Sequence, residues 1–384
     1  MNSNQNLDFD LTEEMTMLRR TAREFSESEI LPKVMQYDEA QEFPANLMTR
    51  MAELGFLGAT VPEELGGAGM TAREFAVIME ELGRVDPSVA LTLAAHSGLC
   101  LEHILLFADD EQKRNYVPDL ATGKTIGSWC LTEPGSGSDA AAMLTTAEKR
   151  GSKYIVNGTK NFITNGSHAS TFVVMTRTDP AKGKAGISAF IVEKQMGVRV
   201  GKKENKLGFR ASDTVQLVFE NVEVPAENLL GKEGEGLKQA LAVLDSGRVG
   251  VAALAVGLAQ GAMEASIRYA KERKAFGKAL GEFQGIQFKV ADMATEIQAA
   301  RLLTLRAADA KALGKPLTLV AAYAKYFASE VAQRVATEAV QIHGGYGYIK
   351  EFPVEKFYRD AKLLTIGEGT SEVQRMVIAK NILG

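Results

Sequence analysis

A single carboxylate stands between two glycines near the C-terminal end of the chain, in the run Gly367-Glu368-Gly369. Glycines on both sides leave close, unobstructed backbone around Glu368. A carboxylate placed in this way can serve as a general base. A helix is expected to start just after it, however, and carboxylates near a helix N-terminus are often only capping groups. Spacing alone favours the capping role.

Two further clusters of small and polar residues could bind a ligand. Residues 132–139 are rich in glycine and hydroxyl groups and follow the apolar run Trp129-Cys130-Leu131. A strand that ends in such a loop exposes backbone N–H groups, which suit a phosphate or the edge of a flat heteroaromatic ring. A surface turn explains the segment equally well. Residues 341–347 contain paired glycines, for which a helix C-cap is the simpler explanation.

Familiar catalytic and metal-binding patterns fail in this sequence. Gly123-Lys124-Thr125 ends like a phosphate-binding loop, but Pro118 stands where that motif requires a glycine. The chain has no dinucleotide-binding glycine fingerprint, no nucleophile elbow and no H-E-x-x-H zinc motif. His96 and His103 would lie two turns apart on one helix face without a third ligand, so packing is favoured over metal binding.

Composition indicates an ordinary globular protein of 384 residues, with 46% hydrophobic and 24% charged residues. The net charge of −4 argues against nucleic-acid binding. Two cysteines, Cys100 and Cys130, form no disulfide framework and favour a reducing compartment. Residues 1–10 are polar and acidic, unlike a targeting peptide, and the longest apolar stretch, 249–259, is too short to span a bilayer. We expect a soluble, cytoplasmic protein without a membrane span.

Helical signals dominate residues 1–122. One helix face is predicted by apolar residues at alternating spacings of four and three: Leu11, Met15, Leu18, Ala22 and Phe25. Thr71 and Glu74 have the spacing of a capping box, and Gly83 suits the end of that helix. Asp86-Pro87 then predicts the start of the next helix.

Residues 123–232 change to the pattern of an antiparallel β domain. Asn157-Gly158 predicts a type I′ hairpin turn between strands at 154–156 and 160–164. Further strands are expected at 171–176, 186–192 and 215–219, which are rich in β-branched and aromatic residues.

Residues 233–384 return to long helices. We expect helices at 236–273, 283–313, 316–343 and 371–383, separated by Gly277, Gly314 and Gly344-Gly345. Ser371 and Gln374 occupy capping-box positions in the last of them. The order helix, sheet, helix predicts an α+β protein in which helical domains flank a β domain.

Six separate blocks, in this order from about residue 10 to the C-terminus, resemble the acyl-CoA dehydrogenase family, and most of all its short-chain and butyryl-CoA members. The blocks are Leu131-Thr132-Glu133-Pro134 with Gly137-Ser138-Asp139, Asn161-Phe162-Ile163-Thr164-Asn165, Glu272-Arg273-Lys274-Ala275-Phe276-Gly277, Gln341-Ile342-His343-Gly344-Gly345-Tyr346-Gly347, Arg359-Asp360-Ala361-Lys362 and Glu368-Gly369-Thr370-Ser371-Glu372-Val373-Gln374-Arg375. The resemblance implies the fold of that family, with a C-terminal four-helix bundle.

The resemblance also implies non-covalent FAD, bound between the β domain, the C-terminal helices and a neighbouring subunit. The cofactor residues that it assigns are Trp129, Leu131, Thr132, Ser138, Phe162, Ile163, Thr164, Thr370 and Glu372, with Arg273, Phe276, Gln284, Gln341, Gly344 and Gly345 coming from the partner subunit. An arginine suits the FAD pyrophosphate because its fork of N–H groups matches phosphate oxygens.

By the same resemblance, Glu368 is the base that takes the α-proton of an acyl-CoA thioester. Residues assigned to the substrate are Ser138, Asp245 and Arg248 for the CoA portion, Leu91, Ala95 and Leu99 for the acyl chain, and Gly369. Some relatives carry the base at the position of Gly247, which cannot act. A tyrosine common in short- and medium-chain enzymes is replaced here by Gly367, from which we expect tolerance of branched or cyclic acyl groups.

The implied assembly is a homotetramer built as a dimer of dimers, and the implied electron acceptor is an electron-transfer flavoprotein. The apolar acyl-site residues disfavour a dicarboxylyl substrate, because an unpaired buried carboxylate would be costly. Three alternatives stay open at this point: an acyl-CoA oxidase, another flavin enzyme on the same fold, and a catalytically silent flavin-binding homologue.

Overall fold

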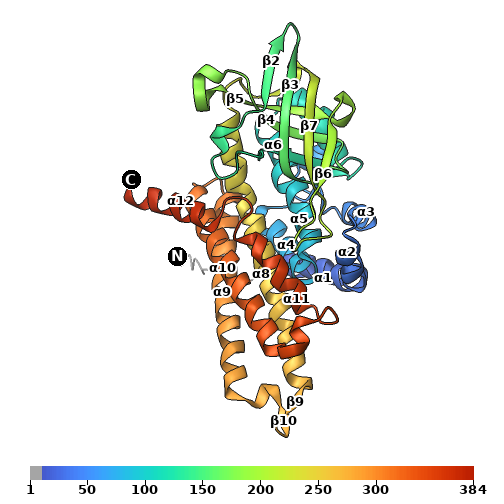
Figure 1. The fold of residues 1–384 in the computed structure, drawn as a ribbon, viewed down its shortest axis with the longest axis vertical. Coiled ribbons are helices and arrows are strands. Elements are labelled where there is room, and N and C mark those ends of the chain that lie inside the picture. Colours follow the sequence, from blue (N-terminus) through green and yellow to red (C-terminus); the bar gives the residue numbers. More distant parts are fainter. Residues whose placement is uncertain (1–10) are drawn as a thin grey trace, which may run out of the picture.

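The computed structural model describes residues 11–384 as two helical parts and one β part (Figure 1). Figure 1 shows the sheet at one end of the molecule, the long helices α8, α9 and α10 running away from it, and the N-terminal helices beside the junction. The predicted α+β class is confirmed. Residues 1–10, which entered the argument against a targeting peptide, lie outside the described residues.

The N-terminal part is helical throughout. Its helices are α1 (Glu13–Phe25), α2 (Val34–Ala40), α3 (Ala45–Glu53), α4 (Ala72–Val85), α5 (Pro87–Leu93), α6 (Glu102–Phe107) and α7 (Asp110–Ala121), with a π-helical stretch at Ala94–Leu101. Thr71 and Glu74 form the predicted capping box of α4. Asp86 caps α5 by accepting from the Ser88 N–H, as Asp86-Pro87 indicated.

The prediction that Gly83 ends a helix was wrong, because α4 continues to Val85. Gly83 instead allows α4 to lie against α8 (Gly236–Glu272). A Cβ at Gly83 would stand 2.7 Å from the carbonyl oxygen of Leu254. The glycine is therefore required by helix packing.

The β part is one eight-stranded sheet with the order β6-β7-β3-β2-β4-β5-β8, and β1 pairs with β4. The strands are β1 (Gly127–Cys130), β2 (Thr146–Arg150), β3 (Lys153–Thr164), β4 (Thr171–Arg177), β5 (Ile187–Glu193), β6 (Arg199–Lys203), β7 (Thr214–Pro225) and β8 (Leu229–Leu230). Most pairs are antiparallel as predicted, but β1 and β2 each run parallel to β4.

The predicted turn at Asn157-Gly158 was also wrong. Strand β3 runs straight through both residues, and the chain reverses earlier, between Arg150 and Lys153. Gly158 has φ +150°, and the register against β7 shifts beside it. The shift in register marks a β-bulge at this glycine. A Cβ at Gly158 would also lie 2.4 Å from the Thr145 hydroxyl, which excludes a larger residue.

The C-terminal part is built around α8, with α9 (Gln284–Ala312), α10 (Thr318–His343), α11 (Val354–Leu364) and α12 (Ser371–Leu383). A short hairpin of β9 (Lys274–Ala275) and β10 (Lys278–Ala279) forms its tip. The four predicted helices are found, whereas α11 was not predicted. Thr370, and not Ser371, caps α12, since its hydroxyl accepts from the Val373 N–H.

Two helical segments, Pro87–Phe107 and Gly236–Glu272, are long and apolar enough to span a membrane, which corrects the expectation that no stretch reaches that length. In each segment, 78% of the apolar window is buried inside the protein. Both segments pack as interior helices of the described fold.

One buried ion cluster joins all three parts. Lys356 on α11 lies 2.8 Å from Asp86 at the start of α5 and 2.7 Å from Asp360. Asp360 also accepts a hydrogen bond from the backbone N–H of Phe209, in the β part. Burial opposes the charge of Lys356, yet Asp360 and Asp86 together raise its pKa above the usual range.

We expect Lys356→Met to lower the free energy of unfolding by about 3–5 kcal/mol, because it leaves two carboxylates buried without their cation. The measurement is urea unfolding at pH 8 and a fixed flavin concentration. The matched control is Lys350→Met, whose partner Glu39 is exposed and 3.5 Å away. Equal stability of the two variants would contradict a structural role for the cluster.

Candidate active site

Glu368 lies in the short connection between α11 and α12. Its φ of +52° is in the left-handed region, which non-glycine residues seldom adopt, and Gly369 follows with φ +88°. The seven non-glycine residues with positive φ in the described chain include two other predicted site residues, Phe162 and Phe276. Backbone strain of this kind is often concentrated at functional sites.

The carboxylate of Glu368 is enclosed but unpaired. Its Oε2 atom is buried and has no hydrogen-bond partner among the described residues. Burial raises the pKa of Glu368 to about 7, while the nearby cations Lys325 and Arg248 act in the opposite direction. A carboxylate poised near neutral pH can both take up and release a proton.

Lys325 is a site residue that the sequence argument missed. It is fully buried on α10, and its Nζ donates to the carbonyl of Gly369 at 2.6 Å. Burial lowers the pKa of Lys325 to about 8. Gln374 donates to the same carbonyl at 3.0 Å. A lysine on the otherwise alanine-rich buried face of a helix was the signal available in the sequence.

Gly247 leaves the space that the base occupies. A Cβ at this position would stand 2.8 Å from Glu368 Oε2 and 2.8 Å from Leu99 Cδ2. A cavity of about 10 Å³, the size of one water molecule, adjoins Gly247 and is also lined by Ala94, Gly98 and Gly250. Leu99, predicted to contact the acyl chain, is thus beside the base.

Not every predicted substrate residue is gathered at this cavity. None of the predicted acyl-chain residues Leu91, Ala95 and Leu99 lines it, and Ser138 lies exposed in the loop after β1. Arg248 is buried beside Glu368 and pairs with Asp245, while its Nε atom has no partner in the described chain. Asp245 also accepts from the Thr318 hydroxyl.

The residues that follow β1 and the C-terminal end of β3 form the second predicted surface. The carbonyl oxygens of Leu131 and Thr132 accept from Lys160 Nζ and the Asn161 N–H, at 3.1 and 2.8 Å. Ile163 is buried and Thr164 half-buried, but Phe162 is 62% exposed between them. An exposed, strained phenylalanine presents a flat apolar face to a ligand.

Trp129 is buried, and its indole N–H donates to His103 Nδ1 at 3.0 Å. His103 also bonds Gln239, and His96 bonds the backbone at Leu120 and Gly127. Both histidines therefore serve packing, as predicted. Within residues 11–384, no cluster of three or more His, Cys, Asp or Glu side chains could hold a metal ion.

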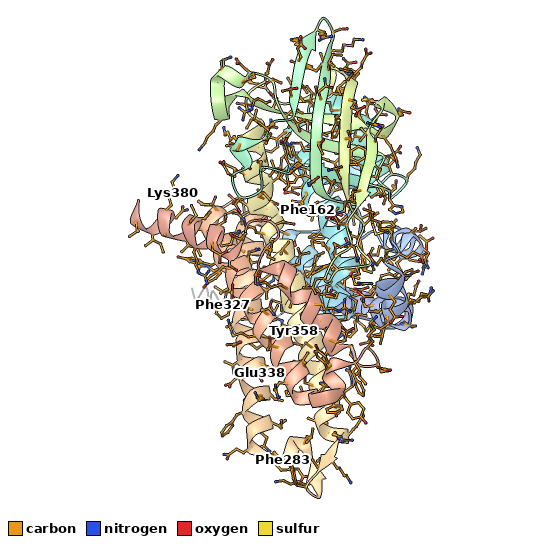
Figure 2. All side chains as sticks on the ribbon, viewed as in Figure 1. Phe162, Phe283, Phe327, Glu338, Tyr358 and Lys380 are labelled. Atoms are coloured by element: carbon orange, nitrogen blue, oxygen red, sulfur yellow. The ribbon has the colours of Figure 1, made fainter. Side chains whose placement is uncertain are left out.

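Most of the remaining predicted cofactor residues lie far from Glu368. Figure 2 shows Phe162 at the edge of the β part and Phe283 at the opposite tip of the bundle. Phe276, 97% exposed, packs its ring 6.3 Å from that of Phe283. The Arg273 guanidinium lies over the Tyr346 ring, which ties the hairpin to the residues that follow α10.

Other members of this distant group are exposed at the same end: Gln284, Gln341, Gly344 and Gly345. Thr370 and Glu372 lie beside the base loop, Thr370 as the cap of α12 and Glu372 exposed in its first turn. One chain thus carries two separate groups of predicted cofactor residues.

Comparisons with known proteins cover the whole fold. Family profiles described as the N-terminal, middle and C-terminal domains of acyl-CoA dehydrogenase match residues 12–124, 128–222 and 234–383. The acyl-CoA dehydrogenase, short-chain specific, of Clostridium acetobutylicum is 46% identical over 377 residues, 98% of this chain and 100% of that protein.

Two solved structures superpose closely on the chain. The butyryl-CoA dehydrogenase from Megasphaera elsdenii has a TM-score of 0.97 and 44% identity, covering 98% of this chain and all of that one. A chain in a structure described as "Electron transferring flavoprotein of Acidaminococcus fermentans: Towards a mechanism of flavin-based electron bifurcation" has a TM-score of 0.97, 49% identity and the same coverage. The protein belongs to the acyl-CoA dehydrogenase family and is an oxidoreductase.

Proposed function

We propose that this acyl-CoA dehydrogenase converts a short- to medium-chain acyl-CoA to the trans-2-enoyl-CoA, with Glu368 as the base that takes the α-proton. The observation that carries the proposal is the buried, unpaired Oε2 of Glu368, for which the missing side chain of Gly247 leaves room. The α-proton moves to Glu368 and a hydride leaves the β-carbon, so that a carbon–carbon double bond forms. This balance requires a two-electron acceptor.

A thioester α-proton is too weakly acidic for an unassisted carboxylate. Donors at the thioester oxygen must therefore stabilise the negative charge that develops there. The backbone N–H of Glu368 donates to no acceptor within the described chain and is free for this role. Its fixed position on the strained base loop suits a preorganised donor.

FAD fits the residues present. When bound, FAD would supply the two-electron acceptor for the hydride, through N5 of its flavin ring. Thr132, Phe162 and Thr164 would hold its ring system, because Phe162 presents an exposed aromatic side chain near the end of β3. Phe276 is almost fully exposed at the distant tip of the helical bundle. The predicted cofactor residues at that end would contact the pyrophosphate and adenosine of a neighbouring subunit's cofactor.

This division of the cofactor residues supports a homotetramer, a dimer of dimers in which each subunit completes its neighbour's site. An electron-transfer flavoprotein is the proposed acceptor of the flavin's electrons, in line with the structural relative described by that name. A cytoplasmic location stays a prediction.

Gly367 supports the proposal that branched or cyclic acyl groups are accepted. The nearest atoms to a Cβ at this position would belong to Leu363, at 3.6 Å or more, an ordinary contact distance, so a side chain as large as tyrosine is not required here by packing. A branched or cyclic acyl group would therefore meet no side chain at residue 367.

We expect Glu368→Gln to slow anaerobic bleaching of the bound flavin by butyryl-CoA at least about a hundredfold, because the amide cannot accept the α-proton. Glu111→Gln, an exposed glutamate on α7, is the matched control and should bleach like wild type. Unimpaired bleaching by Glu368→Gln would place the base elsewhere.

The rate should also depend on pH in a defined direction. Glu368 acts when deprotonated, so kcat/KM should fall as the pH drops below about 7, the pKa that burial gives this carboxyl. Lys325→Met removes a cation that lowers this pKa, and it should move the acid limb to higher pH. Lys380→Met, exposed on α12, should leave the limb in place. A uniform loss of rate at every pH would show that Lys325 acts without its charge.

Gly367→Leu should reduce kcat/KM for isobutyryl-CoA more than for butyryl-CoA, because the new side chain fills the open space beside the α-carbon. The measurement is the ratio of the two values in each protein. A ratio equal to that of wild type would separate Gly367 from substrate choice.

A further inference from the structure

A buried ion pair lies behind the segment that follows β1. The Lys160 side chain on β3 is fully buried, and its Nζ lies 2.7 Å from Oε1 of Glu133, which is buried as well. The same ammonium donates to the carbonyl oxygen of Leu131 at 3.1 Å. Taking two charges out of water is costly, so a buried pair of this kind is weak evidence for a gain in stability. Its contact with a predicted cofactor residue indicates another role.

Both members of the pair are charged. Glu133 also accepts from the backbone N–H groups of Leu144 and Thr145, at 2.5 and 3.0 Å. Burial acts to raise the pKa of Glu133, but Lys160 and these two donors bring it below the usual range. Burial lowers the pKa of Lys160, and the charge of Glu133 opposes that shift. An ionised carboxylate at hydrogen-bond distance therefore keeps the lysine as an ammonium.

The backbone around this pair leaves one donor free. The carbonyl of Thr132 accepts from the Asn161 N–H at 2.8 Å. The N–H and the carbonyl of Glu133 both bond to Ser136, at 2.9 and 3.1 Å. The N–H of half-buried Thr132 donates to no acceptor within the described chain. Since backbone donors are seldom left unpaired, this N–H is available to a ligand.

Lys160 acts on the free donor through one peptide group. The carbonyl of Leu131 and the N–H of Thr132 belong to the same planar unit, in which they point in opposite directions. An ammonium bound to that carbonyl fixes the plane of the peptide. It also strengthens the N–H as a donor, because hydrogen bonds that share a peptide group polarise one another, and more so in a buried site than in water.

We propose that Lys160 is a positioning residue for the flavin: it holds and polarises the Leu131–Thr132 peptide, so that the Thr132 N–H donates to the flavin ring and raises the flavin's affinity for electrons. This inference rests on the proposed function, since it takes FAD to be bound against Thr132. A flavin that has received a hydride carries more negative charge than the oxidised ring. A preorganised donor at its edge therefore favours the uptake of electrons.

The test measures the two-electron midpoint potential of the bound FAD at pH 7, against a reference dye. Lys160→Met keeps the length of the side chain but removes its charge and its hydrogen bond to Leu131. We expect the equilibrium constant for reduction to fall at least tenfold, which lowers the midpoint potential by about 30 mV or more.

Glu133→Gln distinguishes this role from a purely structural one. Both single variants break the same buried pair, but Glu133→Gln leaves the ammonium on the Leu131 carbonyl. Its midpoint potential should therefore stay at or above the wild-type value. The double variant Glu133→Gln/Lys160→Met leaves no unpaired charge and differs from Glu133→Gln only in the ammonium. Its potential should lie below that of Glu133→Gln by about 30 mV or more, which keeps the test valid if Lys160→Met does not fold.

Lys356→Met is the matched control for a loss of stability. It also leaves carboxylates buried without their cation, but on α11 and α5 rather than beside β1. It should weaken the fold and keep the wild-type midpoint potential.

The outcomes separate the two proposals. If butyryl-CoA reduces the wild-type flavin but removing the ammonium leaves the potential unchanged, or if both single variants lower it equally, the role of Lys160 is overturned and the proposed function stands. If the potentials shift as expected but no acyl-CoA reduces the wild-type flavin, the proposed function fails and the role of Lys160 stands. A wild-type protein that binds no FAD would overturn both.

Discussion

The position of the base depends on one buried lysine. Lys356 holds Asp86 of the N-terminal part and Asp360 of its own helix, and Asp360 in turn holds the backbone of the β part at Phe209. The base loop begins as soon as α11 ends, two turns after Lys356. Since breaking a buried ion pair is costly, the cluster fixes α11 against both neighbouring parts. The loop that carries Glu368 therefore begins at a point held in place by contacts with all three parts of the protein.

Close helix packing places the pocket against that loop. A Cβ at Gly257 or Gly261 on α8 would stand 2.1 or 2.0 Å from a carbonyl oxygen of α4. These glycines let α4 and α8 touch backbone to backbone. The same contact brings Gly247 and the π-helical stretch Ala94–Leu101 together, and residues of both line one small cavity. The alanine- and glycine-rich character of α8 is therefore a requirement of the site as much as of the core.

Structural features that depend on short-range interactions were predicted correctly from the sequence. The caps at Thr71 and Asp86 were correct because a side chain bonding its own turn needs no distant partner. The roles of Gly83 and Gly158 were predicted wrongly because α8 and Thr145, remote in sequence, determine them. Glu368 was recognised through family resemblance, since its spacing alone favoured a cap.

The groups that surround the base were beyond sequence reasoning for the same reason. Lys325 reaches the carbonyl of Gly369 only when α10 packs against the loop that carries Glu368, and Glu102 meets Lys311 only when α6 and α9 come together. Neither pair has a fixed spacing along the chain, so the sequence could single out Lys325 on its alanine-rich helix face but not the group that it contacts. A single lysine or glutamate in a helix is most often a solvated residue.

In the proposed mechanism the charge of Glu368 changes in every cycle while its position does not. The structure separates these two demands. Lys325 and Gln374 bind the carbonyl of Gly369, and Ser371 is held by Glu330 through its hydroxyl and by Thr365 through its N–H. None of these bonds involves the Glu368 carboxylate, whose Oε2 stays unpaired. Because the loop is held by its backbone, protonation of the base breaks no bond that positions it.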